Sequence, residues 1–410
     1  MVRLLTPMLF VIGWLAGPGI TPAAAPAASP PAAGEQATAP AAAAPDTAAV
    51  ERVLAKLERL TGVPRKRPVA ARIMNKAEIE ALVLHKLGED YTEAEIREET
   101  IILETLGLVP AGTDLKRLVA ELYTEQLGGF YDPGSGAYVM ADWIDPALQE
   151  AVMAHELVHA LQDQYGGIGG ALQDRVRHDD DAALALMALL EGGATVAMLA
   201  YMTDTPVERV AAIPGIAATL RAAARQSQEQ TAVFARAPVF LQAAMLFPYL
   251  EGTDFVCRLM ATRTFAQILR LVEHPPDTTE QILRPEKYLS SPPENGRPAA
   301  LDESHWRELG RPAGQPRRWG QFQLAEFLKR GLPETDAVAA ARGWGGDTLV
   351  LVARGDGRPP LVLWLIAWDT AADADRFQAA LGAWSADAPR LVAARTATDT
   401  VLLRIGDGPP

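Results

Sequence analysis

The chain has 410 residues, of which 49% are hydrophobic and 22% charged, a balance typical of a globular protein with room for two domains. Its formal net charge of −13 argues against nucleic acid or an anionic membrane as the main partner, because both bind basic patches. The single cysteine, Cys257, excludes an internal disulfide and a zinc site built from several cysteines.

Residues 1–25 have the pattern of an export signal. Arg3 supplies the positive start, residues 4–15 form a short apolar core, and alanines at 23–25 provide a cleavage site. The core is shorter than the about 20 residues that span a bilayer. We therefore expect an exported protein, periplasmic or secreted, whose signal is removed. An uncleaved membrane anchor is the alternative.

The next segments predict a tether followed by a helical domain. Residues 26–45 are almost entirely Ala and Pro, so they have too little bulky apolar surface to pack and should form a disordered tether. Helical periodicity predicts a predominantly helical domain over residues 46–273. Its first helices are expected at residues 46–60, 76–87, 92–108 and 113–127.

A β-hairpin and a capped helix are predicted next. Residues 129–140 place aromatic and β-branched side chains on both sides of an Asp-Pro-Gly-Ser-Gly turn. Asp145 and Pro146 then mark the start of a helix, and two glycines at 166–167 mark its end. The edge of the hairpin is expected to hold an extended substrate by main-chain hydrogen bonds, so a proline at Val139 should change KM.

The rest of the chain predicts one more apolar helix and a second domain. The helix is expected from about residue 181 to 202, and the Pro-rich residues 274–298 are expected to form a linker. Residues 299–410 predict a small α+β domain, with strands at 347–353, 361–367, 390–394 and 400–405 and a helix at 371–384. The expected fold class of the whole chain is therefore α+β.

The helix after the hairpin contains the sequence HELVH at residues 155–159, an HExxH pattern. Residues four apart share one helix face, with Cβ atoms about 5–6 Å apart, so His155 and His159 can reach one metal ion. Glu156 lies beside them, where it can act as general base on a water that the metal activates. The alternative is a surface helix with two solvated histidines.

A catalytic zinc usually has three protein ligands, so a third is needed. Gln162 and Tyr165 stand where the longer HExxHxxGxxH pattern requires Gly and His, which excludes that class. Glu191 is the candidate, because it interrupts an apolar helix where an ionised carboxylate is costly unless a cation or hydrogen bonds satisfy it. The alternative is that Gly192 ends the helix and Glu191 points to solvent.

Weaker candidates also have simpler structural interpretations, as charge clusters, solvated carboxylates or core aromatics. His178 could be a substitute ligand. Asp163 or Asp180 could accept a hydrogen bond from an imidazole and so orient it. A substrate carbonyl could be polarised by one of three tyrosines, Tyr131, Tyr165 or Tyr201.

The HExxH helix followed by EGGAT at residues 191–195 resembles the gluzincin-type zinc metallopeptidases. It is more similar to poorly characterised exported bacterial proteins that pair an HExxH helix with a later E-G-x-A-T helix, over roughly residues 128–201. The resemblance implies His155, His159 and Glu191 as ligands of one Zn²⁺ per chain, and Glu156 as catalytic base. The thermolysin-like pattern would place an Asp where this chain has Thr195.

These patterns predict an exported zinc-dependent metallopeptidase whose partner is a peptide or protein substrate. One alternative is an exported binding or scaffold protein with a structural or vestigial metal site, in which Glu156 is dispensable. Another is a zinc hydrolase that acts on a non-peptide amide. The motif does not separate a peptide from another amide, and it leaves the oligomeric state open.

Overall fold

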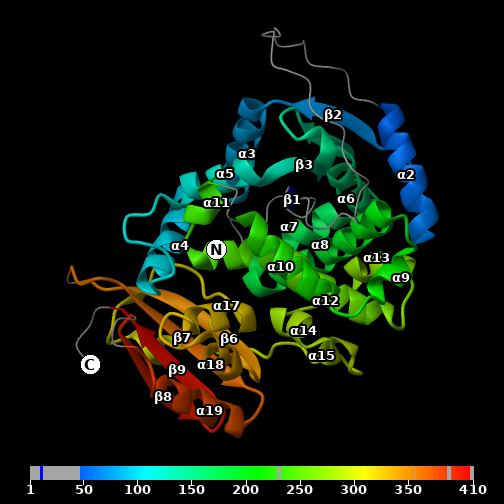
Figure 1. Ribbon diagram of the computed structural model, residues 1–410. Coiled ribbons are helices and arrows are strands. Elements are labelled where there is room, and N and C mark those ends of the chain that lie inside the picture. Colours follow the sequence, from blue (N-terminus) through cyan, green and yellow to red (C-terminus); the bar gives the residue numbers. More distant parts are fainter. Residues whose placement is uncertain (1–9, 13–46, 229–231, 356, 386–388, 407–410) are drawn as a thin grey trace.

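The computed structural model describes residues 10–12, 47–228, 232–355, 357–385 and 389–406. Helices dominate a mixed α+β fold that contains two small sheets (Figure 1). The predicted fold class is confirmed. The tether expected at residues 26–45, and all of the predicted signal except residues 10–12, lie outside the described residues.

The helical body lies at one end of the molecule and the second sheet at the other (Figure 1). Its helices are α2 (Thr47–Thr61), α3 (Lys76–Asp90), α4 (Glu93–Thr105), α5 (Leu115–Gln126), α6 (Pro146–Gly166), α7 (Ile168–His178), α8 (Asp180–Thr203), α9 (Val207–Ala211), α10 (Ile216–Gln228), α11 (Ala232–Arg236), α12 (Val239–Met260), α13 (Phe265–Leu269), the 3-10 helix η2 (Arg270–Glu273), α14 (Thr279–Leu283) and α15 (Pro285–Leu289). The first four predicted helices correspond to α2–α5.

Side-chain caps explain where several of these helices begin. Asn75 and Thr92 each accept a hydrogen bond from the third backbone N–H of their helix, and the glutamate at that position accepts one from the backbone N–H of the cap residue. Asp145 caps α6 by accepting from the N–H of Ala147 at 2.8 Å. Gly167, at φ 66°, ends α6 in the left-handed conformation that favours glycine. The predicted start and end of this helix are confirmed.

The first sheet has four strands in the order β1-β3-β4-β2. They are β1 (Phe10–Ile12), β2 (Ala70–Met74), β3 (Leu127–Asp132) and β4 (Ala137–Ala141). β3 and β4 form the predicted hairpin. Val139 of β4 is opposite Phe130 on one side and Arg72 of β2 on the other, so it lies inside the sheet. The expectation that Val139 marks a substrate-binding edge is therefore wrong, because β2 covers that side of the hairpin.

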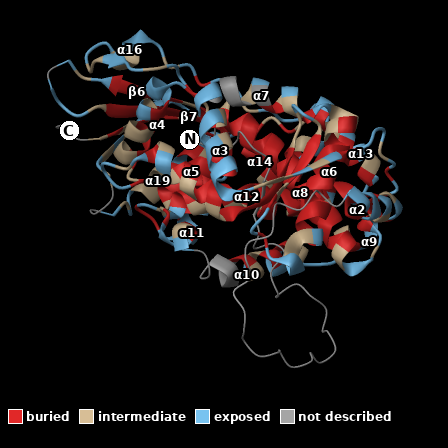
Figure 2. Ribbon diagram, turned by 90° about the horizontal axis from the view of Figure 1, so that it is seen from above, coloured by how far each residue is buried: buried red, intermediate tan, exposed pale blue. Residues whose placement is uncertain are grey.

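Helix α8 forms the centre of the helical body and is buried along almost its whole length (Figure 2). A Cβ atom at Gly192 would lie 2.2 Å from the carbonyl carbon of Gly252 in α12, so the two backbones are in contact. Gly193 faces the metal-binding helix instead, with its added Cβ 3.2 Å from Nε2 of Gln162. By length and composition α8 could cross a membrane, but its apolar window is entirely buried inside the protein, as in a core helix.

The second sheet is antiparallel and has the order β5-β6-β7-β9-β8. Its elements are α16 (Glu303–Trp306), β5 (Arg311–Pro312), α17 (Gly320–Leu328), α18 (Glu334–Ala341), β6 (Trp344–Ala353), β7 (Leu361–Trp368), α19 (Ala371–Leu381), β8 (Leu391–Ala397) and β9 (Thr400–Ile405). The four predicted strands and the predicted helix are found. Helix α17 was not predicted, because all its residues are buried and it therefore lacks an amphipathic pattern.

Residues 274–298, expected to form a linker, contain α14 and α15 and are packed between the two ends of the molecule. Asp181, at the start of α8, accepts from the backbone N–H of Thr279 at 3.0 Å and from its hydroxyl at 2.5 Å. Oγ1 of Thr279 in turn accepts from the N–H of Phe322 in α17 at 3.2 Å. This segment thus connects α8 to the second sheet's helices. The domain boundaries expected from the sequence stay predictions.

One carboxylate organises the core of the second sheet. Asp347, 2% exposed, accepts from the backbone N–H groups of Trp319 and Gly320 at 2.8 and 3.0 Å. It also accepts from the indole N–H groups of Trp344 and Trp364 at 3.2 and 3.1 Å. Four buried donors from three elements therefore depend on one side chain.

Replacing Asp347 with alanine is expected to lower the free energy of unfolding by about 3 kcal/mol or more, since each buried donor without an acceptor costs about 1–3 kcal/mol. Urea unfolding followed by tryptophan fluorescence measures the change. Asp375→Ala is the matched control, because Asp375 is 74% exposed in its ion pair with Arg395. Equal stability of the two variants would contradict this role of Asp347.

Candidate metal centre

Three potential ligands from α6 and α8 converge in the core of the helical body. Nε2 of His155 lies 2.9 Å from Oε2 of Glu191, and Nε2 of His159 lies 3.5 Å from the same oxygen. All three side chains are fully buried. A solvated position for the histidines, or a Glu191 that points to solvent, is therefore excluded. The three residues form a cluster that could bind a metal ion.

The donor set fits a divalent cation. Zinc ligands at about 2.0–2.2 Å in a tetrahedral arrangement lie about 3.4 Å from each other, and the distances of 2.9 and 3.5 Å from Oε2 of Glu191 to the two imidazole nitrogens are close to this value. Nε2 of His159 and Nδ1 of His155 are buried without a hydrogen-bond partner among the described residues. Buried nitrogens without partners are costly, and a cation would satisfy at least the one that faces Glu191.

Burial and charge shift the pKa values of the three groups. Burial lowers the pKa of His155 to about 4. Burial acts in the same direction on His159, but the nearby charge of Glu191 outweighs it and raises the pKa of His159 to about 9. Burial would raise the pKa of Glu191, yet the charge of His159 and the hydrogen bond from His155 hold it below its usual value. Glu191 is therefore an anion in the core, where it attracts positive charge.

Gln162 orients one of the imidazoles. Its Oε1 lies 2.6 Å from Nδ1 of His159, and its Nε2 donates to the carbonyl oxygen of Leu190 at 2.8 Å. Because Oε1 can only accept, this contact assigns a proton to Nδ1, so Nε2 is the nitrogen that could coordinate a metal ion once its own proton is displaced. Gln162 stands three residues after His159 on the same face of the helix, so the spacing alone could have indicated it.

The two carboxylates expected as imidazole partners have other surroundings. Oδ2 of Asp163 accepts from the hydroxyl of Tyr131 at 2.9 Å and pairs with Arg67 at 2.7 Å. The charge of Asp180 acts on Arg317 at the second sheet. The expectation that Asp163 orients an imidazole is therefore wrong. The side chain of His178, the substitute ligand, lies outside the described part of α7.

Glu156 is held beside the metal cluster by the hairpin. Its Oε2 accepts from the backbone N–H of Tyr131 in β3 at 2.7 Å, and the side chain is fully buried. Its charge acts on His159, which stands one helical turn further along α6. The carboxylate therefore lies between the edge of the hairpin and the candidate ligands.

The three tyrosines expected to polarise a carbonyl have hydroxyls engaged elsewhere. Tyr131 donates to Asp163, Tyr165 donates to the carbonyl oxygen of Pro64 at 2.7 Å, and Tyr201 donates to Glu150 at 3.0 Å. None of these partners is a candidate ligand.

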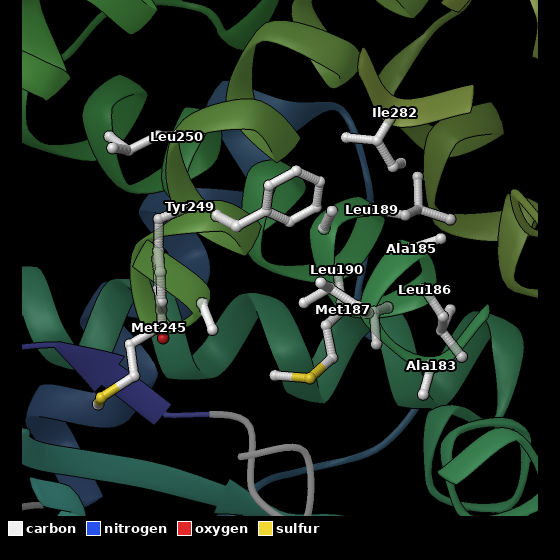
Figure 3. Packing of buried hydrophobic residues seen from close by; sticks show 14 of the residues in the cluster. Ala183, Ala185, Leu186, Met187, Leu189, Leu190, Met245, Tyr249, Leu250 and Ile282 are labelled. Atoms are coloured by element: carbon white, nitrogen blue, oxygen red, sulfur yellow. The ribbon is translucent and has the colours of Figure 1, made fainter. Parts of the chain in front are cut away.

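Tyr249 of α12 approaches the cluster instead. Its ring centroid lies 6.1 Å from that of His155, and the charge of Glu191 acts on its hydroxyl. Figure 3 shows Tyr249 and Met245 on the same side of α12, away from Leu250. Burial, together with the charges of Glu191 and Glu156, raises the pKa of Tyr249 well above its usual value. The hydroxyl therefore keeps its proton and can donate.

Comparison with known proteins adds little to this geometry. Residues 309–409 match a family model described as "Domain of unknown function (DUF8575)", which covers the second sheet and α17–α19 but not the metal cluster. No curated protein matches the chain. A solved structure described as "a putative hydrolase with a novel fold from Chloroflexus aurantiacus" is similar with 16% identity and a TM-score of 0.39, over 61% of this chain and 91% of that one.

Proposed function

We propose that the protein is an exported, zinc-dependent metallopeptidase that hydrolyses peptide bonds. The observation that carries the proposal is the convergence of two imidazole nitrogens and one carboxylate oxygen, with a second carboxylate beside them. When bound, zinc supplies Lewis-acid chemistry, because it acidifies a water and polarises a carbonyl. His155, His159 and Glu191 would hold the ion.

The chain's own residues would perform the proton transfers. Glu156 would take the proton of the attacking water and return it to the leaving amine. The N–H of Tyr131 holds one oxygen of Glu156 in place, so the carboxylate needs little reorganisation during the reaction. A site that only held a structural metal would need the three ligands but not Glu156. The buried and positioned Glu156 therefore favours an enzyme over a scaffold.

The sheet beside Glu156 favours a peptide over another amide. β3 pairs with β4 on one side. On its other side it pairs with the short strand β1 of the N-terminal segment, and an extended substrate could take that place. An extended peptide on that side would form main-chain hydrogen bonds close to Glu156. The proposal of an exported location rests on the signal pattern of residues 1–25.

Tyr249 would donate to the oxygen that becomes negative as the carbonyl is attacked. Replacing Tyr249 with phenylalanine is expected to lower kcat about 10²–10³-fold, since one oxyanion donor contributes that much. The metal content should not change, because the ring still fills the same space. Steady-state kinetics measures the loss, with Tyr201→Phe as the control because that hydroxyl binds Glu150. A Tyr249→Phe enzyme as fast as the control would remove Tyr249 from this role.

The direct test combines metal analysis with substrate cleavage. Purified protein is expected to bind one zinc and to cut a mixed peptide library, read by mass spectrometry, only when no chelator is present. Glu191→Ala should weaken zinc binding more than about 100-fold, whereas Gln162→Leu should weaken it about 10–100-fold, as is typical of residues that orient a ligand. Zinc binding without any cleaved peptide would favour the scaffold alternative. Equal zinc affinity in both variants and wild type would contradict the ligand assignment.

A further inference from the structure

A strand from the N-terminal apolar segment lies along the open side of β3. β1 pairs antiparallel with β3, with Phe10 opposite Phe130 and Ile12 opposite Leu127. β1 also contacts α6, the helix that carries the HExxH sequence. In Figure 1, β1 lies in the middle of the helical body, close to β3 and far along the chain from it. The sequence had assigned these residues only to the apolar core of an export signal.

β1 uses the groups that an extended substrate would need. A strand at the end of a sheet presents unpaired N–H and C=O groups to any extended chain. On β3 the positions that pair with β1 lie next to Tyr131, whose own N–H holds Glu156. Glu156 and the three candidate ligands are all 0% exposed in this arrangement. The pairing of β1 with β3 therefore occurs together with complete burial of Glu156 and the candidate ligands.

We propose that residues 10–12 act as an intramolecular cap, which occupies the substrate side of β3 and is withdrawn when the N-terminal segment is cut off. The inference rests on the proposed peptidase function. A tethered segment competes at an effective concentration of about millimolar. A free peptide of equal affinity for β3 would therefore have to exceed about millimolar concentration to displace it. Removal of the predicted signal would then couple export to opening of the metal centre.

The experiment uses the full chain, with the recognition sequence of a site-specific protease introduced between residues 26 and 45. The folded protein is cut, the released N-terminal peptide is removed by gel filtration, and cut and uncut samples are compared. Hydrogen exchange of the β3 amides reports on the strand pairing and does not depend on catalysis. The cut sample is expected to exchange the outward-facing β3 amides at least tenfold faster and to cleave peptides at least tenfold faster.

Substitutions within the uncut chain give a second measurement. Phe10→Pro combined with Ile12→Pro should reproduce the effect of cutting, because proline cannot donate to a strand partner. Phe10→Tyr combined with Ile12→Val is the matched control, since both residues still favour strands. Circular dichroism checks that both variants keep their helices.

The outcomes separate the cap from the proposed function. Unchanged β3 exchange after cutting and in the proline variant would overturn the cap, whatever the protein catalyses. Faster β3 exchange without any peptide cleavage would support the cap and count against the peptidase. Faster exchange together with faster cleavage would support both.

Discussion

Glu156→Gln is expected to lower kcat for peptide cleavage by about 10²–10⁴-fold, the contribution typical of a general base. Glutamine has nearly the same shape and its amide oxygen can still accept the N–H of Tyr131, so the local structure should stay intact. It cannot take a proton from water. Zinc content, measured by atomic emission, should remain one per chain, because Glu156 is not among the three candidate ligands.

Glu150→Gln is the matched control for this substitution. Glu150 lies in the same helix, but its carboxylate accepts the hydroxyl of Tyr201 and is not part of the metal cluster. Its kcat should stay within about twofold of wild type, as is usual for a change away from the reacting atoms. Wild-type turnover in Glu156→Gln would remove Glu156 from the mechanism and leave the scaffold alternative in place.

Gly192→Ala is expected to destabilise the protein by about 3 kcal/mol or more. Alanine normally stabilises a helix by about 1 kcal/mol relative to glycine. Here the new Cβ would lie 2.2 Å from the carbonyl carbon of Gly252, and backbone atoms cannot move aside as a flexible side chain can. Helices α8 and α12 would have to separate, and Tyr249 and Glu191 would separate with them.

Gly193→Ala tests whether the loss of stability in Gly192→Ala comes from the contact with α12 or from the change of a glycine within α8. The added Cβ at Gly193 meets only Nε2 of Gln162, at 3.2 Å, which can adjust. The midpoint of urea unfolding of Gly193→Ala should stay close to that of wild type, whereas the midpoint of Gly192→Ala should fall clearly. If the two variants unfold at the same denaturant concentration, the close approach of α8 and α12 is not a constraint.

The local parts of the site could be predicted from the sequence because they depend on short-range patterns. The ends of α6 follow from Asp145 and the glycine pair, and the HExxH spacing places two imidazoles on one helix face. Glu191 could be singled out because a charge interrupts an apolar run. In the structure, His155, His159 and Glu191 form one cluster, as these patterns predict.

The non-local parts could not be predicted. Tyr249 lies in an apolar helix, and nothing in its neighbourhood indicates that it faces residues 58 or more positions earlier. β2 pairs in parallel with β4 across a long stretch of chain, so no local pattern indicates that Val139 is enclosed on both sides. β1 has the composition of a signal core, and only its pairing with β3 distinguishes it from one.

The acidic residue in the middle of α8 has a consequence for passage through a membrane. The helix is long and apolar enough to lodge in lipid if it met a bilayer before folding. A charged side chain at the bilayer centre costs about 2.5–3.5 kcal/mol, and Glu191 stands close to the middle of the helix. If the protein is exported as proposed, the carboxylate that faces the two imidazoles in the folded protein would therefore also disfavour arrest of the unfolded chain in the membrane.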